Sequence, residues 1–465
     1  MKRSRASGQL TCSCCALDRA ASEFDQRAVS RLERGNEEDS PLTCSLCRSL
    51  KAALIALRTN NVKCVATRSD PSTEFLRDPV SAPVVRTAKQ FFASFPRVDY
   101  RAILGPVTGW RTQAKLCVRK TRSSAVVIGL FLPGSHSVVS CLHSPVHHPA
   151  INAMAHVVMT ACKLCGVDGY SEESDSGLLR YLVMSVESRS QTVQLSLVWN
   201  ESRVSETLRR LGRVVRSIAA SAEDRNLLHS LWANLHKTSR HDNAITGREE
   251  GSWVFLEGSP SAPEEVIATD MTAAPHPTLF FPHTVFRQAN IEGFARIIRE
   301  IRRWVPRKGV CVELYAGVGT IGLNLIDLVE RIHCSDENPH NQRCFERSLA
   351  GMPPELRHKA SYSSLSAVAV VQKFGLNDCD YVIVDPPRKG LDAEVVEALT
   401  SDTSLRSPLQ RLMYVSCGFK AFQRDCQALL ASGRWTLLHA EGYVLFPGAD
   451  HVETLAVFDR NYEGE

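Results

Sequence analysis

The amino-acid sequence predicts an α/β protein whose C-terminal part is a doubly wound parallel sheet. From about residue 270 onward, apolar strand-like runs alternate with helical patterns, which is the order that builds such a sheet. A glycine-rich turn follows one of these runs, and acidic or thiol side chains stand where others end. Ligands bind at the carboxyl ends of the strands in open α/β sheets, so these side chains are the first candidates for a functional site.

Length and composition are typical of a globular protein with two or three domains. The chain has 465 residues, of which 44% are hydrophobic and 23% charged. No stretch approaches the roughly 18 uninterrupted apolar residues of a membrane span, so we expect no membrane partner. The net charge of +5 is compatible with nucleic-acid binding without being diagnostic of it. Sixteen cysteines spread through so long a chain do not suit a secreted disulfide framework, and we expect an intracellular protein.

Two Cys-x2-Cys pairs near the N-terminus predict a small unit that binds a structural zinc ion. The expected ligands are Cys12, Cys15, Cys44 and Cys47. Two such pairs can place four thiolates tetrahedrally around one zinc ion. Cys14 leaves the choice of ligand in the first pair open, and the alternative is two unrelated cysteine pairs in a flexible segment. A zinc unit of this size usually binds RNA or protein.

Between the cysteine pairs and the C-terminal sheet, the sequence predicts a mixed α/β domain. Strands are expected over 114–119, 125–131, 181–186, 192–199 and 227–235, with a helix over 203–220. Basic and aromatic residues alternate through this region: Trp110, Arg111, Lys115, Arg119, Arg122, His136, Arg180, Tyr181, Trp232 and His236. This mixture suits RNA binding and equally suits a solvated sheet face. The expected domains are 1–68 for the zinc unit, 69–95 for a linker, 96–265 for the central domain and 266–465 for the C-terminal domain.

The glycine-rich turn predicts a site for an adenosine-containing cofactor. A strand over 309–314 leads into Tyr315-Ala316-Gly317-Val318-Gly319-Thr320, and a helix is expected to follow. Gly317 and Gly319 let the backbone approach a ligand closely. Asp336 follows Gly317 at the spacing where an acid accepts hydrogen bonds from ribose hydroxyls.

Three later strands deliver an acid, a thiol and a second acid. Asp385 ends one apolar run, and the prolines after it stiffen its loop. Cys417 ends the next run, and Glu453 stands where the last strand begins. Alone, Cys417 is interpreted as a buried core thiol and Glu453 as a surface carboxylate. Their combination with the glycine-rich turn favours a reactive site.

In order and spacing, these segments resemble the SAM-dependent RNA 5-methyluridine methyltransferases. The motifs that carry the resemblance are Val285-Phe286-Arg287-Gln288-Ala289-Asn290, Tyr315-Ala316-Gly317-Val318-Gly319, Asp385-Pro386-Pro387-Arg388, Val415-Ser416-Cys417, Phe446-Pro447 and His451-Val452-Glu453. The resemblance is specific over 280–458. It extends more weakly to about residue 110, where it is closest to organellar-type plant homologues.

The resemblance implies a Rossmann-like methyltransferase domain and a role for each matching residue. Cys417 attacks C6 of uracil, C5 takes the methyl group, and Glu453 removes the C5 proton so that elimination releases the thiolate. The implied SAM contacts are Gln288, Tyr315, Gly317, Gly319, Thr320, Asp336 and Asp385. The implied substrate contacts are Arg388, Phe446 and His451.

The sequence departs from the family pattern in both motifs that carry the reactive residues. Gly418 and Phe419 follow the cysteine where many relatives have Asn-Pro, so the shape of that loop can differ. Asp450 stands where the terminal motif usually has a first histidine. The N-terminal RNA-binding barrel of other relatives is not visible, and we expect the zinc unit to take over its work.

A third departure concerns the 4Fe–4S cluster that some relatives hold on four cysteines. Cys64 and Cys141 match the first and last of these positions. Asp70 and Thr73 stand at the middle two, which leaves too few thiolates. We therefore predict no iron–sulfur cluster.

The expected function is methylation of uracil C5 in RNA, with transfer RNA favoured over ribosomal RNA as the partner. One alternative is methylation of another base such as cytosine, but Asp385-Pro386-Pro387 lacks the second cysteine that cytosine enzymes usually carry. The other is an RNA-binding or RNA-folding factor whose methylation is dispensable. We expect a monomer. The sequence leaves open which uridine is modified and whether the compartment is the cytoplasm or an organelle.

Overall fold

The structure is a computed structural model, and it describes residues 9–12, 14–15, 17–26, 43–58, 70, 72–121, 126–221, 226–237, 245–246, 251–266, 276–376, 378–401 and 408–461. The chain divides into two compact units. The first consists of Met1–Pro71 and Arg111–Pro260, and the second of Ser72–Trp110 and Ser261–Glu465. Each unit is therefore built from two separate stretches of sequence, and the expected boundaries at 68, 95 and 265 do not coincide with these divisions.

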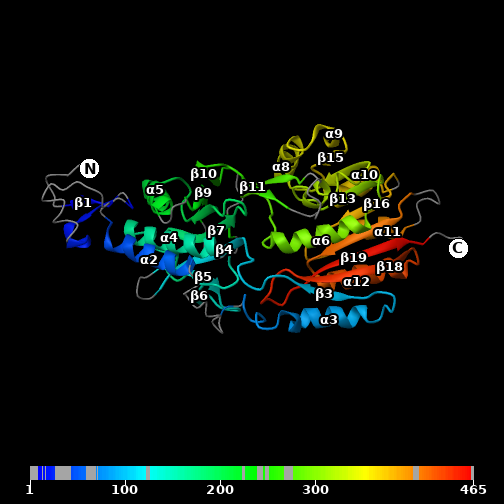
Figure 1. Cartoon of the computed structure of the whole chain (residues 1–465), viewed down its shortest axis with the longest axis horizontal. Coiled ribbons are helices and arrows are strands. Elements are labelled where there is room, and N and C mark those ends of the chain that lie inside the picture. The colour runs from blue at the N-terminus through cyan, green and yellow to red at the C-terminus, as the bar shows by residue number, and fades with distance from the viewer. Residues whose placement is uncertain are drawn as a thin grey trace. The chain divides into compact units, whose positions relative to one another are not determined.

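The first unit is built on a seven-stranded mixed sheet with the strand order β10-β9-β8-β7-β4-β5-β6 (Figure 1). Its strands are β4 (Gln113–Lys120), β5 (Val126–Phe131), β6 (Val138–Ser140), β7 (Leu179–Val186), β8 (Val193–Trp199), β9 (Leu228–Leu235) and β10 (Trp253–Gly258). Neighbouring strands run antiparallel except β8 and β9, which are parallel. The five strands and the helix expected in this region are all present.

Helices join this sheet to the cysteine-rich segment. The elements are β1 (Gln9–Thr11), β2 (Asp18–Ala20), η1 (Ala21–Glu23), α2 (Ser45–Arg58), α4 (Pro149–Cys165) and α5 (Glu206–Ser221). α4 packs against both α2 and α5. It is apolar on nearly every side and is buried accordingly, and Gly166 ends it in the left-handed conformation with φ 67°. The buried cysteines near the N-terminus belong to the same hydrophobic core as the sheet.

Two arginines of the expected RNA-binding surface are buried instead. Arg119 is 5% and Arg180 is 3% exposed. The Arg119 guanidinium donates to Glu172 and to the hydroxyl of Tyr181, and it lies over the Tyr181 and Tyr170 rings. Both arginines are thus enclosed by aromatic rings and acceptors, which satisfies their charge inside the unit. The expectation that these two residues contact RNA or solvent is wrong, and Arg122 lies outside the described residues.

The second unit contains an eight-stranded sheet with the order β15-β14-β13-β16-β17-β19-β18-β3. Its strands are β3 (Arg101–Leu104), β13 (Val310–Leu314), β14 (Arg331–Ser335), β15 (Ala360–Ser363), β16 (Tyr381–Val384), β17 (Arg411–Ser416), β18 (Trp435–Val444) and β19 (Glu453–Arg460). The five strands β13 to β17 run parallel, and β19 is antiparallel to its neighbours. This arrangement confirms the predicted doubly wound α/β fold.

Helices cover both faces of this sheet because successive strand residues point to opposite sides. The helices are η2 (Pro79–Ser81), α3 (Pro83–Phe92), α6 (Ile291–Trp304), α7 (Thr320–Leu323), α8 (Pro339–Ala350), α9 (Pro354–Arg357), α10 (Ala367–Phe374), α11 (Ala393–Thr400) and α12 (Phe419–Ala431). The strands β11 (Ala262–Glu265) and β12 (Thr278–Phe281) form a separate two-stranded sheet. Ile383 and Met413 face the core with α6, α7 and α8. Val382 and Leu412 face the core with α3, α10, α11 and α12.

Two local expectations differ from the structure. The expected linker 69–95 contains α3, whose Val85, Ala88 and Phe92 are buried at helical spacing in the second unit's core. A helix was expected after the glycine-rich turn. That helix, α7, spans only four residues, and the chain continues in turns from Asn324 onward. Among the described residues, no helix has the length and apolar character that a membrane crossing requires.

Candidate active site and metal centre

A cavity of about 600 Å³ in the second unit gathers eleven of the twelve residues that were predicted to react or to contact SAM or the substrate. Those that line it are Gln288, Tyr315, Gly317, Thr320, Asp336, Asp385, Arg388, Cys417, Phe446, His451 and Glu453. Gly319 is the predicted residue that does not line it. Gly319 precedes α7 at φ 81°, and a Cβ there would stand 2.4 Å from the Phe345 ring, so it serves close packing.

The topology of the sheet explains why these residues meet. β13 lies between β14 and β16, and the chain proceeds from β13 outward to β15 before it returns to β16. The strand order therefore reverses between β13 and β16, which opens a crevice at their carboxyl ends. The residues that directly follow β13, β16 and β17 are Tyr315, Asp385 and Cys417, in that order.

The glycine-rich turn is shaped for close approach of a ligand. Tyr315 has φ 60°, an uncommon conformation for a bulky side chain, and its hydroxyl donates to Asp392 at 3.0 Å. Gly317 has φ 56°, and no atom lies within 4 Å of the position that a Cβ would take. The backbone conformation at Gly317 favours glycine, and the open space beside it leaves room for a ligand.

Asp336 is fixed at the edge of this turn. Its Oδ2 accepts a hydrogen bond from the Gly317 N–H at 3.1 Å. Its Oδ1 accepts from the Asn338 N–H at 2.9 Å and from Nδ2 of Asn341 at 3.0 Å. Asn338 and Asn341 also line the cavity, and the sequence analysis did not single them out. Their position shortly after Asp336 at the start of α8 is the signal that would have found them.

Glu313 is a further acid that the sequence analysis missed. It is 1% exposed near the carboxyl end of β13, and its Oε2 accepts from the Gly322 N–H at 2.9 Å and from the Cys334 thiol at 3.1 Å. Burial raises its pKa to about 8. An acid inside an otherwise apolar strand was the available signal. Its contacts hold the start of α7 against β13.

Two carboxyl groups and one thiol share the reactive end of the cavity. Burial raises the pKa of Glu453 to about 8, and the charge of Asp385 adds to the shift. Burial likewise raises the pKa of Asp385 to about 7. Burial and the two carboxylates raise the pKa of the Cys417 thiol to about 12, whereas the Arg388 charge opposes the shift. Positive charge placed near these groups would favour the ionised form of each.

Cys417 lies at the carboxyl end of β17 beside the loop that carries Asp385. Its Sγ is 4.0 Å from the Pro386 carbonyl oxygen, and it is only partly buried. The departure at Gly418 has a geometric reason, because a Cβ on this residue would stand 2.4 Å from the Arg388 carbonyl oxygen. The backbones of the two loops touch at this point.

The loop before β19 contributes an aromatic wall. The Phe446 ring meets His451 edge-on at 4.6 Å and Trp110 edge-on at 5.5 Å between ring centroids. Nε2 of His451 is 3.7 Å from Oε1 of Glu453. Asn290, the last residue of the Gln288 motif, donates to the Leu445 carbonyl at 2.8 Å and so ties that motif to the loop.

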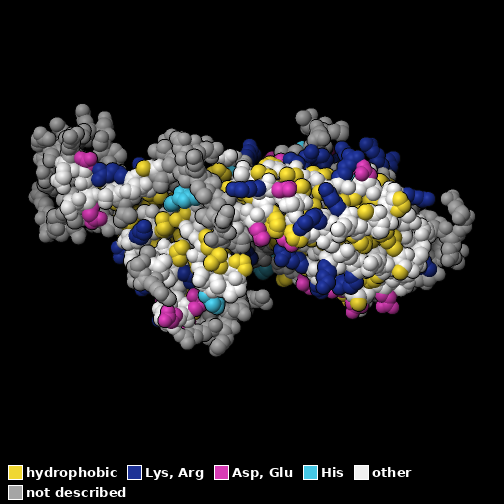
Figure 2. Space-filling model, turned by 90° about the horizontal axis from the view of Figure 1, so that it is seen from below, with side chains coloured by type: hydrophobic (Ala, Val, Ile, Leu, Met, Phe, Trp, Pro, Cys, Tyr) yellow, Lys and Arg dark blue, Asp and Glu magenta, His cyan; other side chains and the backbone are white. Residues whose placement is uncertain are grey.

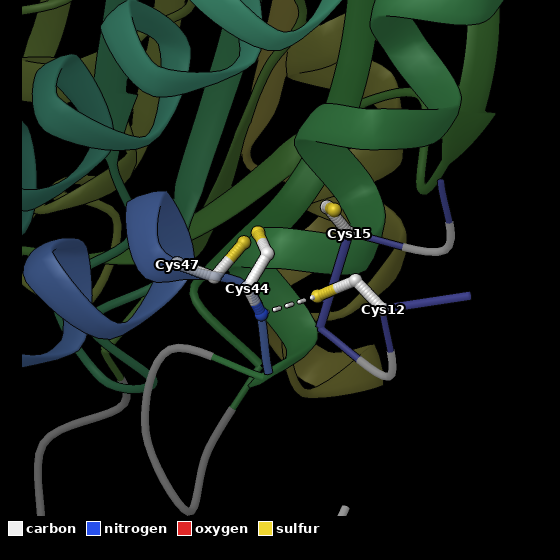
Figure 3. Close-up of side chains that lie close together, drawn as sticks. All are labelled: Cys12, Cys15, Cys44 and Cys47. Carbon is white, nitrogen blue, oxygen red and sulfur yellow. Dashed lines mark hydrogen bonds between the residues drawn. The ribbon is translucent and has the colours of Figure 1, made fainter. Parts of the chain in front are cut away.

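The four predicted zinc ligands form a second site, in the first unit. The Sγ atoms of Cys12, Cys15, Cys44 and Cys47 lie within 4.8 Å of one another and are buried (Figure 3). The Cys44 N–H donates to Sγ of Cys12 at 3.3 Å. Cys14 is also buried but is not part of this group.

The fold and the cavity define a doubly wound α/β enzyme with a cofactor turn and a thiol beside two acids. An uncharacterized RNA methyltransferase of Protochlamydia amoebophila is 34% identical to the chain over 356 residues, which cover 77% of this chain and 87% of the relative. An uncharacterized RNA methyltransferase of Geobacter sulfurreducens is 28% identical over 360 residues, covering 75% of this chain and 65% of the relative. The chain belongs to this family of RNA methyltransferases. No family model matches it.

A solved structure supports the fold. It is the crystal structure of the Pyrococcus abyssi tRNA (uracil-54, C5)-methyltransferase in complex with S-adenosyl-L-homocysteine. The two chains superpose with a TM-score of 0.61 over 80% of this chain and 81% of the other. Their sequences are 19% identical, so the likeness concerns the fold.

Proposed function

We propose that this RNA methyltransferase transfers a methyl group from SAM to C5 of a uracil base. The observation that carries the proposal is the meeting of Cys417 with Asp385 and Glu453 in one cavity that also contains the glycine-rich turn. A thiol near a buried acid of raised pKa is what addition to a pyrimidine ring followed by proton removal requires.

The residues around the turn fit the cofactor. The open space at Gly317 admits a ligand against the backbone, and Asp336 is held by three donors with its carboxylate at the cavity wall. Asp336 would accept hydrogen bonds from ribose hydroxyls, and Gln288 and Tyr315 would contact the rest of the molecule. When bound, SAM supplies an electrophilic methyl group on a cationic sulfur. A positive charge there favours the ionised forms of Asp385, Glu453 and Cys417.

In the proposed reaction, the Cys417 thiolate adds to C6 and forms a carbon–sulfur bond. The electrons of the C5–C6 double bond move toward O4, which would make C5 nucleophilic enough to take the methyl group from the sulfonium of SAM, with S-adenosyl-L-homocysteine as the leaving group. Glu453 then takes the C5 proton, the carbon–sulfur bond breaks, and the double bond re-forms. Arg388 is proposed to face the negative charge that develops on the ring. Its own positive charge lowers the pKa of the Cys417 thiol and so favours the thiolate.

The substrate is proposed to be RNA, with transfer RNA preferred to ribosomal RNA. The Pyrococcus abyssi protein of similar fold is named for uracil 54 of tRNA. Figure 2 shows Lys and Arg side chains spread over the surface, which suits a polyanionic partner. A base inside a folded RNA has to leave its stack to enter such a cavity, where Phe446 and His451 are proposed to contact it. We also propose that the protein is a monomer and that it acts inside the cell. Its proposed relatives include the organellar-type plant homologues.

The test is methylation of RNA that lacks 5-methyluridine by the full-length protein with labelled SAM. We expect 5-methyluridine at defined positions in transfer RNA and none with Cys417→Ala. Asp336→Ala should raise KM for SAM about tenfold or more, because it removes the carboxylate that is proposed to accept hydrogen bonds from the ribose hydroxyls. The effect on kcat should be smaller. Methylated cytosine in place of uridine, or methylation unaffected by Cys417→Ala, would reject the proposal.

We also propose that the four clustered cysteines hold one zinc ion. In a tetrahedral site with zinc–sulfur bonds of about 2.3 Å, the sulfur atoms are roughly 3.8 Å apart, which fits the observed cluster. An iron–sulfur cluster would hold the thiolates farther apart, because iron and sulfide atoms lie between them. Metal analysis of the full-length protein should find one zinc per chain, lost in Cys44→Ser and retained in Cys165→Ser. Iron in place of zinc would contradict the proposal.

The prediction that the 4Fe–4S cluster is absent stays a prediction. Cys64 lies outside the described residues. Asp70 is buried, and its Oδ2 accepts from Oγ of Ser144 at 3.3 Å. Iron analysis of the same preparation tests this prediction.

A further inference from the structure

Residues 72–95, expected to be a linker, contact both loops that carry the reactive side chains. We call them the brace segment. The first loop, residues 445–452, leads into Glu453, and the second follows Cys417. The brace segment meets these loops at Asp450 and Phe419, which are two positions where the sequence departs from the family pattern.

Asp450 caps the helix of the brace segment. Its Oδ1 accepts a hydrogen bond from the Val84 N–H at 2.8 Å, in the first turn of α3. The residue at the helix cap itself is Ala82, whose side chain has no acceptor. Asp450 therefore supplies from a distant part of the chain the acceptor that a helix start needs, and its negative charge suits the helix dipole.

A second contact joins the same loop to the brace segment through backbone atoms. The Phe75 N–H donates to the Gly448 carbonyl at 3.0 Å. Gly448 has φ 101°, and a Cβ there would stand 2.3 Å from the Ser72 carbonyl oxygen. Only glycine permits this approach, so the loop is held by the brace segment on both sides of Ala449.

Aromatic rings make the contact with the other loop. Phe419 is the first residue of α12, two positions after Cys417. Its ring lies 5.9 Å from the ring of Phe91 in an edge-on arrangement and 6.1 Å from that of Phe92. Phe422 joins the same cluster. Such aromatic pairs add directional attraction to apolar burial.

We propose that the brace segment positions the two reactive loops relative to each other, with Asp450 and Phe419 as its positioning residues. The inference rests on the proposed function for the reaction that it serves. Both loops follow or precede strands of one rigid sheet, but their side chains have to be held within fractions of an ångström for reaction. One segment in contact with both loops provides that constraint.

The test compares full-length Asp450→Ala with Asp450→Asn, because asparagine keeps an oxygen that caps a helix. The control is Asp78→Ala, which removes an equal charge from the same segment at a side chain that makes no cap. In Asp450→Ala we expect kcat about fivefold lower, because a small misplacement of the reactive loop slows the reaction, and a smaller rise in KM for RNA, because the loop also carries Phe446 and His451. Asp450→Asn and Asp78→Ala should stay within about twofold of the wild type.

Hydrogen–deuterium exchange gives a readout that does not depend on activity. Asp450→Ala should increase exchange in peptides covering 445–453, and Asp450→Asn should not. Unchanged exchange in Asp450→Ala, or failure of Asp450→Asn to restore kcat, would overturn the inference. A wild-type protein that methylates no uridine would instead overturn the proposed function, and the exchange data would still decide about the brace segment.

Phe91→Leu tests the contact with the Cys417 loop. It should slow formation of the covalent Cys417–RNA adduct, measured with an RNA containing 5-fluorouridine. The control is Phe374→Leu, an exposed phenylalanine on α10 outside the cavity. Equal adduct rates in both variants would count against the role of Phe419.

Discussion

The backbone of Gly418 lies against that of Arg388, so closely that a Cβ on residue 418 would stand 2.4 Å from the Arg388 carbonyl oxygen. This contact joins the loop after Cys417 to the loop of Asp385. Backbone atoms on both sides leave little room for adjustment, because neither loop can move without moving a residue of the cavity wall.

Gly418→Ala should therefore displace the nucleophile loop. We expect at least a tenfold loss of the methylation rate and a loss of about 1–3 kcal/mol in the free energy of unfolding, as for other overpacked sites. Gly105→Ala is the control, since its nearest neighbour is a flexible arginine side chain at 3.9 Å. Wild-type activity in Gly418→Ala would contradict the tight contact.

The methylation rate should increase with pH through the titration of Glu453. A base has to be ionised, and burial raises the pKa of this carboxyl to about 8. The rate of breakdown of the methylated Cys417–RNA adduct, a step that needs the base but no ionisation of the thiol, should fall about tenfold per pH unit below that value and level off above it. With Glu453→Gln, the covalent adduct should accumulate because the C5 proton stays in place. A rate independent of pH between 6.5 and 9.5 would exclude Glu453 as the base.

The same carboxyl should make the protein less stable at neutral than at acidic pH. Its pKa is about 8 in the folded state and near the ordinary 4.5 in the unfolded chain. Above pH 4.5 the unfolded chain releases the proton that the folded chain keeps, so this contribution to stability declines between pH 4.5 and 8. At pH 8, the free energy of unfolding of Glu453→Gln should exceed that of the wild type by on the order of a few kcal/mol. At pH 4, the two proteins should have the same free energy of unfolding. Exposed Glu355→Gln should show no such difference.

A buried ion pair supports the motif of Gln288. Arg287 donates to Glu264, and both side chains are at most 1% exposed. Glu264→Gln should lower the free energy of unfolding by about 3–5 kcal/mol, because it leaves a guanidinium without its counter-charge. The neighbouring, exposed Glu265→Gln should have little effect. Chemical denaturation measures the free energy of unfolding of both variants. If the double variant Glu264→Leu/Arg287→Met recovers part of the lost free energy, the unpaired charge is the cause of the loss.

The cavity residues were predictable because their positions follow from a rule of the fold. Parallel strands end at one edge, so residues after β13, β16 and β17 had to meet there. The carboxylate pair with raised pKa was not predictable, because burial depends on the closed cavity. The same holds for Arg119, whose charge is satisfied by Glu172 and Tyr181 from distant positions.

The brace segment shows most clearly where prediction from sequence ends. Its proline-rich start was interpreted as a linker, yet α3 is amphipathic and buries one side. The contact between Val84 and Asp450 joins residues 366 positions apart. Local patterns carry no information about such a pair.

The placement of β3 affects how the protein is made. β3 pairs with β18 in the second unit, and residues 111–260 of the first unit are synthesised between them. The ribosome therefore releases β3 and α3 long before their partners exist. Until β18 and β19 emerge, the apolar side of α3 has no sheet to cover, and a chain that stops early would expose that side and an unpaired strand edge to aggregation. Completion of the reactive cavity thus waits until β18 and β19 have been synthesised.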